Sequence, residues 1–487
     1  MTLQQTSLLT HIHPKSALPI TAKNRIAKFC GCSTLMILLP LITHISLAEE
    51  LDISEEGGYT LTEIMSPLKV SSSQKIAQQT PIATYNGNVY IVNIEPGELG
   101  DEDGINLHTT IHQGKSDITG AWSWTKTTLE IRTIHDPWHT PPAVGIDKLG
   151  YIHVAYNMHN FPWQYSVSDQ PDSIKSFTFL GEKISLEEIK KAKFENKTSF
   201  KTYGYSSIPG NQITYPAFYT DNDGELFVTY RFAAKPALNF KSRTMSAGIA
   251  KYDALTKQWT SLGGKLNNKK GDYKKSWYKK DLIPKSLASE QGWTVYHPRM
   301  AFDRENKSFI TLFWREGVAG ETLTKPCVMH TKDFNIFMSM QGDVLDLPIT
   351  SKDCSNISTE IENKSTYNTI GSVTSDSEGT IHIITSPIDS PREIITFKQG
   401  TWISQPSPNG ATDIFTDHRN NLWALASGLN IFQKSPTEIE WKHVIVSDDK
   451  ISCFPKASLN KDKTTAYIYS QSCDDSNTVS VHKLEMK

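Results

Sequence analysis

Two pairs of side chains that could act in acid–base chemistry lie at matched distances from polar turns. His139 and His159 are equally far from one turn, and Tyr215 and Arg231 are equally far from the next. In an antiparallel hairpin, residues equally distant from the turn lie together at the open end. A guanidinium there could neutralise a carboxylate while an imidazole or a phenol removes a neighbouring proton. The spacing therefore predicts a proton-abstracting rim, although each residue alone is more often an ordinary hydrogen-bonded side chain.

Further polar residues could contact a sugar at this rim. Asn160 follows the second imidazole, and His297 and Arg315 repeat the spacing about a third turn. A lysine-rich insertion near residues 261–290 interleaves its positive charges with aromatic residues such as Tyr273. This insertion is either a solvated loop or a source of positive potential and stacking surface for a sulfated or carboxylated polysaccharide.

Seven hairpins with one common pattern must position these residues. Each has a strand, a turn rich in Asp, Asn and Gly, and a second strand that alternates apolar and polar residues. The copies begin at Pro81, Pro141, Tyr215, His297, Gly371, Thr412 and Phe454. A polar turn followed by a tryptophan marks outer strands at Trp122, Trp259, Trp402 and Trp441. Because a single blade leaves its edges exposed, radial closure predicts an all-β, seven-bladed β-propeller, with a β-sandwich pair as the alternative.

The composition bounds the class of protein and its partners. The chain has 487 residues, of which 38% are hydrophobic, so it is long enough to bury a large core. Its 50 Lys plus Arg against 52 Asp plus Glu give a net charge of -2. This balance excludes a globally basic nucleic-acid coat, and any anionic partner must meet a local patch.

An export signal is predicted over residues 1–48. Its only charged residues are basic and precede the apolar run 35–42, which is too short to span a bilayer. Cleavage after Ala48 removes four basic and no acidic residues, which leaves 46 basic against 52 acidic residues and a net charge near -6. Residues 49–487 are then expected to form a single propeller domain. We expect a secreted or periplasmic protein, and a membrane anchor is the alternative.

Four cysteines remain after this cleavage, and an oxidising compartment would let them pair. Cys453 and Cys473 flank the last hairpin and are predicted to form a disulfide. Cys327, Cys354 and His330 are either ligands of a structural zinc ion or, for the two cysteines, partners in a disulfide. The irregular spacing lacks the paired C-x2-C signature of zinc sites, and it favours neither the zinc site nor the disulfide strongly.

The segments HTPPAVGIDKLGYIHVAYNMHN and TYPAFYTDNDGELFVTYR, which hold the two pairs, resemble the BNR-like propeller proteins. Among the BNR-like propeller proteins, the chain resembles specifically the propeller-type ulvan lyases of polysaccharide lyase families 24 and 25. The resemblance implies β-elimination at the uronic acid of a sulfated rhamnose–uronic acid polymer. It implies that Arg231 and His159 bind the carboxylate, that His139 and Tyr215 share the roles of base and acid, and that Tyr273 belongs to the substrate site.

The resemblance also sets the expected cofactors and partners. β-Elimination requires no cofactor, so the structural zinc ion is the one metal considered. The expected partner is a sulfated polysaccharide that contains uronic acid, and not a nucleic acid. We expect a monomer without a stable membrane span.

Two other functions fit the propeller pattern. A sialidase-like glycoside hydrolase would need a clamp of three arginines, for which Arg231, Arg299 and Arg315 are candidates, but it leaves the two rim histidines unexplained. A non-catalytic glycan-binding propeller is the other, because a fold alone does not determine chemistry.

Overall fold

The computed structural model describes residues 58–71, 79–97, 107–130, 140–182, 208, 212–235, 244–266, 285–316, 327–353, 367–387, 391–446, 452–472 and 477–487. The chain divides into two units, Met1–Ile42 and Thr43–Lys487, and all the described residues belong to the second. The predicted export signal and its cleavage site therefore lie outside the described residues. Within the described ranges, no helix is long and apolar enough to cross a membrane.

Five sheets each contain four antiparallel strands. The first contains, in spatial order, β2 (Ile82–Tyr85), β3 (Asn88–Pro96), β4 (Leu107–Ser116) and β5 (Trp122–Glu130). The second contains β6 (Ala143–Ile146), β7 (Ile152–Ala155), β9 (Tyr165–Ser168) and β10 (Phe177–Phe179). The third contains β21 (Tyr367–Ser375), β22 (Ile381–Pro387), β23 (Glu393–Lys398) and β24 (Thr401–Pro406). The fourth contains β25 (Asp413–Thr416), β26 (Leu422–Ala426), β27 (Asn430–Lys434) and β28 (Lys442–Ile445).

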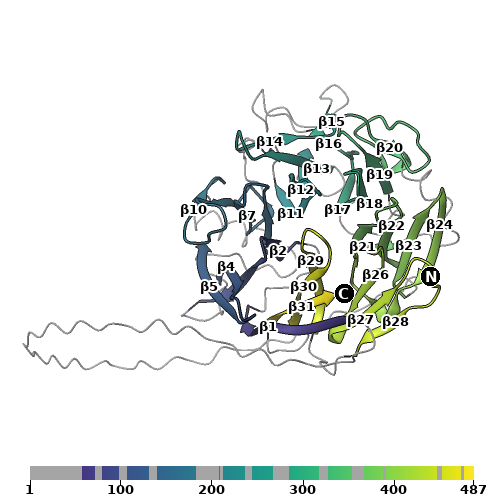
Figure 1. The fold of residues 1–487 in the computed structure, drawn as a ribbon. Helices are drawn as coiled ribbons and strands as arrows, with labels where there is room; N and C mark the ends of the chain where they lie inside the picture. The colour runs from purple at the N-terminus through teal and green to yellow at the C-terminus, as the bar shows by residue number, and fades with distance from the viewer. Residues whose placement is uncertain are drawn as a thin grey trace, which may run out of the picture. The chain divides into compact units, whose positions relative to one another are not determined.

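The fifth of these sheets joins the two ends of the described chain. It contains β29 (Ser452–Leu459), β30 (Thr465–Ser472), β31 (Thr478–Met486) and, paired with β31, the N-terminal β1 (Tyr59–Lys69). Figure 1 shows β1 in purple beside the yellow C-terminal strands. This pairing covers the edge of the last sheet, which would otherwise expose unpaired backbone groups. Two short 3₁₀ helices, η4 (Pro408–Gly410) and η5 (Ser427–Leu429), complete the elements of this half.

A nine-stranded sheet holds the third and fourth predicted hairpins. Its strands are β8 (His159–Phe161), β11 (Ile213–Thr220), β12 (Leu226–Lys235), β13 (Thr244–Asp253), β14 (Gln258–Ser261), β17 (Trp293–Phe302), β18 (Ser308–Glu316), β19 (Cys327–Thr331) and β20 (Met338–Ser339). One parallel pair, Met245 with Thr294, connects β13 to β17. On one side of this pair lie five strands, β8, β11, β12, β13 and β14, and on the other side lie the four strands β17, β18, β19 and β20.

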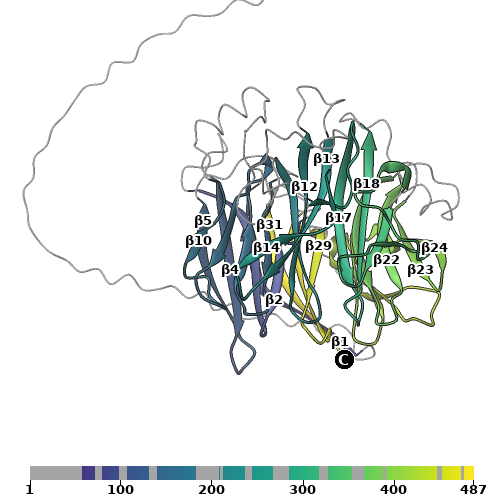
Figure 2. The same cartoon turned by 90° about the horizontal axis from the view of Figure 1, so that it is seen from above.

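The β-propeller class is confirmed. Each of the seven predicted hairpins is a pair of antiparallel strands, from β2–β3 through to β29–β30. The sheets surround a common centre, with the first strand of each unit innermost (Figure 1). Figure 2 shows β2, β17 and β29 between the outer strands β5 and β10 on one side and β23 and β24 on the other. Three of the tryptophans predicted to mark outer strands, Trp122, Trp259 and Trp402, are buried in β5, β14 and β24.

A repeated aspartate fixes the turn of five hairpins. Its Oδ1 atom accepts hydrogen bonds of 2.8–3.0 Å from the backbone N–H groups two and four residues later. The five residues are Asp147, Asp221, Asp303, Asp376 and Asp417. Asx-type bonds of this kind hold the turn without any tertiary contact, which is why polar turns marked the hairpins in the sequence.

Candidate active site

Tyr215 lies at the open end of the β11–β12 hairpin, in a bulge. Thr214 pairs with Arg231 and Ala217 pairs with Thr229, so Tyr215 and Pro216 together oppose one residue of β12. The backbone of Tyr215 has φ = 58°, in the left-handed region, where a non-glycine residue costs about 1–2 kcal/mol. A bulge changes the direction of the side chains beside it, and the side chain of Tyr215 is buried.

His159 and Arg231 are brought to the same part of this sheet by Thr214. Thr214 pairs with His159 on β8 and with Arg231 on β12. Directly paired residues project to the same face, and two strand spacings separate the backbones of His159 and Arg231 by roughly 10 Å. The turn prediction joined His159 to His139 in one hairpin. The structure instead places His159 on β8, which has left that hairpin and pairs with β11.

Asn160 fastens β8 to β11. Its backbone N–H donates to Thr214 Oγ1 at 2.9 Å, and the same hydroxyl donates to Asn160 Oδ1 at 3.3 Å. Asn160 has φ = 61° and is buried. The residue predicted to contact the substrate therefore also holds the strand that carries His159.

The guanidinium of Arg231 contacts two neighbouring tyrosine rings. Its Cζ atom is 4.7 Å from the ring centroid of Tyr215 and 4.8 Å from that of Tyr296 on β17. The two ring centroids are 6.2 Å apart and the rings are inclined by 40°. Cation–π contacts of this kind contribute about 0.5–2 kcal/mol each. Tyr215 and Arg231, nominated together from the sequence, are thus in direct contact.

His297 and Arg315 do not repeat this arrangement, contrary to the prediction. The β17–β18 turn is centred one residue earlier than expected, because Phe302 pairs with Ser308. Arg315 consequently pairs with Thr294 and not with His297. Its Cζ atom lies 5.8 Å from the ring centroid of Tyr296, so Arg315 still approaches the cluster. His297 belongs to β17, and its side chain is outside the description.

Tyr296 is the residue that the sequence analysis missed. Burial alone would raise the pKa of its phenol, but the charges of Arg231 and Arg315 and their hydrogen bonds to the phenol lower the pKa below its ordinary value. It lies just before the dipeptide His297–Pro298, at which the β17–β18 register shifts as it does at Tyr215. Aligning the dipeptides Tyr215–Pro216 and His297–Pro298 matches Tyr215 to His297, so the local pattern does not point to Tyr296.

Of the residues predicted to be catalytic or to bind substrate, two lie outside the described residues: His139 and Tyr273. The base of the insertion that carries Tyr273 is described. There β15 (Gly264–Lys265) and β16 (Lys285–Ser286) pair as an antiparallel ladder.

The structure favours the disulfide alternative over the zinc hypothesis. Cys327 is disulfide-bonded, so its sulfur is not a thiolate ligand, and its predicted partner Cys354 lies outside the described residues. Residues three apart in a regular strand point to opposite faces, which separates Cys327 from His330. Burial lowers the pKa of His330 to about 4. Among the described residues, no group of three or more His, Cys, Asp or Glu could hold a metal ion.

Cys453 is also disulfide-bonded, and its predicted partner Cys473 lies outside the described residues. Cys453 pairs across the last hairpin with Gln471, two residues before Cys473. The Cys453–Cys473 bond stays a prediction.

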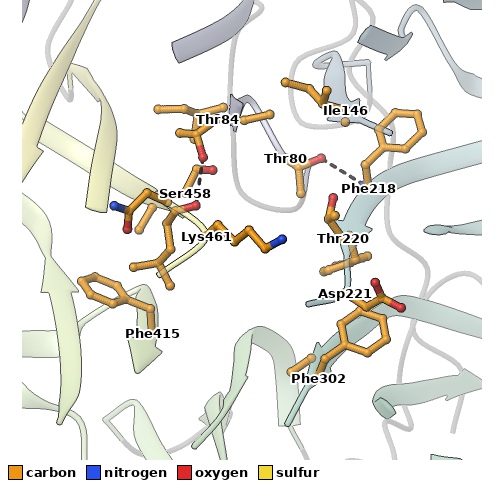
Figure 3. Close-up of a pocket in the computed structure, with 18 of the residues that line it drawn as sticks. Thr80, Thr84, Ile146, Phe218, Thr220, Asp221, Phe302, Phe415, Ser458 and Lys461 are labelled. Atoms are coloured by element: carbon orange, nitrogen blue, oxygen red, sulfur yellow. Dashed lines mark hydrogen bonds between the residues drawn. The ribbon is translucent and has the colours of Figure 1, made fainter. Parts of the chain in front are cut away.

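A cavity of about 1170 Å³ follows the centre of the propeller and is distinct from the cluster around Arg231. It is lined by the first strand of each of the seven hairpins and by the turns of four of them, the first, second, third and seventh. Figure 3 shows Lys461 reaching across it, and a dashed line between Phe218 and Thr80. That line is the bond of the Phe218 N–H to Thr80 Oγ1, at 3.1 Å. Of the residues predicted to be catalytic or to bind substrate, none lines the described part of this cavity.

The cluster at the open end has the parts of a carboxylate-binding acid–base site. A cation, Arg231, contacts a phenol, Tyr215, and an imidazole, His159, lies on the same face of the sheet. Such a set can bind a carboxylate and exchange a proton next to it.

Solved structures similar to this one include two polysaccharide lyases. Polysaccharide lyase Uly1 is 15% identical, with a TM-score of 0.59 over 86% of this chain and 92% of that chain. An ulvan lyase of polysaccharide lyase family 25, bound to -[GlcA(1-4)Rha3S]-, is 13% identical, with a TM-score of 0.56 over 86% of this chain and 95% of that chain. At these identities the likeness establishes a shared fold. The expected resemblance to propeller-type ulvan lyases is confirmed at that level.

Sequence comparison identifies the family. No curated protein matches the chain. The model of the BNR repeat-containing family matches residues 105–409, which is more than half of the chain and includes both predicted pairs. The chain therefore belongs to the BNR repeat-containing family.

Proposed function

We propose that the protein is a polysaccharide lyase that cleaves ulvan, a sulfated rhamnose–uronic acid polymer, by β-elimination. The observation that carries the proposal is the contact of Arg231 with Tyr215 at 4.7 Å, with His159 on the same face through Thr214. A cation beside a phenol suits a reaction in which a carboxylate must be neutralised before its neighbouring carbon can lose a proton.

The elimination balances without any added reagent. A base takes the proton from C5 of the uronic acid, and the electrons of that C–H bond form the C4–C5 double bond. The bond from C4 to the glycosidic oxygen breaks, and an acid protonates the departing oxygen. The products are a new chain end and a 4,5-unsaturated uronyl residue.

The residues divide between these steps as follows. Arg231 and His159 would bind the carboxylate, and negative charge that grows on it in the transition state strengthens the contact with the guanidinium. Tyr215, held in the bulge against Arg231, would exchange a proton with the sugar. His139 would supply the second proton-transfer group.

The choice of ulvan is supported by charge as well as by likeness. A similar structure is bound to a glucuronate–sulfated rhamnose repeat. In this chain Arg315 lies 5.8 Å from the Tyr296 ring, which adds a second cation to the cluster. The lysine-rich insertion begins at the β15–β16 ladder, next to β13 of the same half of the propeller. Both features favour an anionic polysaccharide.

The sialidase-like alternative is weakened by the position of Arg299. A three-arginine clamp would require Arg299 beside Arg231 and Arg315. Arg299 instead lines the central cavity, and its Nε donates to the Gly371 carbonyl at 3.2 Å. Thr294, the partner of Arg315, is five residues before Arg299, or roughly 16 Å along an extended strand.

An absorbance assay tests the proposal. A lyase acting on ulvan generates an unsaturated uronate that absorbs in the ultraviolet, whereas a hydrolase produces a reducing end without this absorbance. We expect an increase with ulvan and a smaller or no increase with alginate, chondroitin sulfate and heparan sulfate. New reducing ends without absorbance would establish a hydrolase. Binding of ulvan without either product would establish a glycan-binding protein.

Export is proposed on the sequence alone. N-terminal sequencing of the protein recovered outside the cytoplasm should begin at Glu49. A protein that keeps residues 1–48 after fractionation with membranes would instead be anchored.

A further inference from the structure

Tyr296 is the centre of a cluster drawn from four strands. Its ring stacks on Phe313 of β18 at 5.6 Å and 25°, and it meets Tyr215 of β11 at 6.2 Å. The guanidinium carbon of Arg231, from β12, is 4.8 Å from its ring centroid, and that of Arg315, from β18, is 5.8 Å away. Tyr296 therefore connects the third hairpin, which carries the proposed site, to the fourth.

Tyr296 makes two kinds of contact with Arg231. The ring centroids of Tyr215 and Tyr296 lie 4.7 and 4.8 Å from Cζ and 6.2 Å from each other, so the two rings contact neighbouring sides of the guanidinium and restrict its position. The partly buried phenol of Tyr296 also accepts hydrogen bonds from Arg231 and Arg315, and their positive charges outweigh the effect of burial on its pKa. Two kinds of contact from one residue thus act on Arg231.

The backing of Tyr296 is rigid. Phe313 is buried and is the direct cross-strand partner of Tyr296. A ring stacked on a buried partner has few alternative rotamers, so Tyr296 can hold its neighbour in place. Arg231 itself is buried, and a buried guanidinium loses its function when its orientation changes.

We infer that Tyr296 is a positioning residue that holds the guanidinium of Arg231 against Tyr215 in the orientation that receives a substrate carboxylate. This inference rests on the proposed lyase function. It gives Tyr296 the role in the site that the turn spacing had assigned to His297. Both residues belong to the fourth hairpin. Tyr296 acts through Arg231 and exchanges no proton with the sugar.

A double-mutant cycle tests this role. Tyr296→Leu removes ring and hydroxyl, and we expect kcat/KM on ulvan to fall by about tenfold, within the range of a lost cation–π contact. Tyr296→Phe keeps the ring, and we expect its kcat/KM on ulvan to fall by about threefold. In the Arg231→Lys background, both substitutions should change kcat/KM by less than about twofold, because the planar group they position is already absent.

The control is Tyr219→Phe, a half-buried tyrosine on β11 that lines the central cavity, which should keep wild-type kinetics. If the factors by which the Tyr296 and Arg231 substitutions lower kcat/KM multiply in the double variants, the two residues act independently and the positioning role is wrong. If Tyr296→Phe lowers kcat as strongly as Tyr215→Phe does, Tyr296 takes part in the chemistry directly. Unfolding midpoints of all variants separate these results from a loss of folded protein.

A titration that needs no substrate distinguishes a failure of this inference from a failure of the lyase proposal. The ultraviolet difference between wild type and Tyr296→Phe reports the ionisation of this one phenol. We expect its midpoint below that of an ordinary tyrosine, and at higher pH in Arg231→Gln. An unchanged midpoint in Arg231→Gln would overturn the contact and the inference, whatever the activity. If the midpoint shifts in Arg231→Gln but the wild-type protein is inactive on ulvan, the lyase proposal is wrong. The contact between Tyr296 and Arg231 would then be established without a role in catalysis.

Discussion

The two ends of the hairpins use their polar residues in different ways. At the turn end, five aspartates make the same two backbone hydrogen bonds in five hairpins. At the open end, the hairpins differ from one another. The third hairpin has a bulge with Tyr215 at φ = 58° and a guanidinium, that of Arg231, in contact with the Tyr215 ring. The register of the fourth hairpin shifts at His297–Pro298, and its Arg315 pairs with Thr294.

The difference indicates where function can be placed on a repeat. A turn whose aspartate is bonded to its own backbone N–H groups stabilises each unit by local bonds. A bulge interrupts the ladder and gives individual side chains new directions, at a cost in backbone strain. The open end of one unit can therefore carry chemistry while the other units keep the propeller closed.

The largest effect should come from Tyr215→Phe. Loss of the phenol hydroxyl removes a proton-transfer group, so turnover on ulvan should fall by about 10²- to 10⁴-fold. His139→Ala should cause a loss of similar size. In Tyr215→Phe the aromatic ring stays in contact with Arg231. The unfolding midpoints of both variants should remain close to that of the wild type. Near-wild-type turnover in both variants would mean that the open end of the third hairpin is not the site.

Replacing Arg231 should have the next largest effect. Arg231→Ala should lower kcat by about 10²- to 10³-fold as well as raise KM, because the charge on the carboxylate grows in the transition state. Arg231→Lys keeps the charge but not the planar fork, and should retain part of the rate. A rise in KM with unchanged kcat would reduce Arg231 to substrate binding alone.

The sequence was informative about the regular end and less so about the irregular one. The Asp turns and the alternating strands predicted all seven hairpins, because local bonds determine them. The contact of Tyr215 with Arg231 followed from the same count. Equal spacing failed for Arg315, because the centre of a hairpin depends on the turn length and its register on bulges. The path of β8 and the position of Tyr296 depend on tertiary pairing, which no local pattern reports.

At the turn end, Asp417→Ala should change stability without changing turnover. Besides its two backbone bonds, Asp417 accepts hydrogen bonds from the buried Trp423 Nε1 at 2.8 Å and from Asn421 Nδ2 at 2.9 Å. Leaving these donors unsatisfied should cost about 4 kcal/mol, measured from urea unfolding. The matched control is Asp117→Ala, which removes the same backbone bonds from an exposed outer turn and should cost much less. A large loss of turnover in folded Asp417→Ala would contradict the separation of the two ends.

The smallest expected effect concerns a charged cluster at the open end of the first hairpin. Glu95, near the end of β3, is buried and accepts hydrogen bonds from His112 Nε2 at 2.5 Å, Thr110 Oγ1 at 2.6 Å and Lys126 Nζ at 3.0 Å. Burial would raise the pKa of the Glu95 carboxyl, but these partners outweigh it and lower the pKa from 4.5 to about 2. A depressed pKa means that the stabilisation is complete above about pH 4.5 and is lost as the pH falls toward 2.

Glu95→Gln tests whether this cluster is structural. Its unfolding free energy should lie below that of the wild type at pH 7, and the gap should narrow by about 3 kcal/mol as the pH falls from 4.5 to 2, since the variant has no carboxylate to protonate. Glu305→Gln, which removes one half of an exposed pair with Lys332, should show a small gap that does not change with pH. Turnover of Glu95→Gln at pH 7 should equal that of the wild type. Parallel pH curves would show that the pair with His112 does not stabilise the fold, and a fall in turnover would extend the functional surface from the third hairpin to the first.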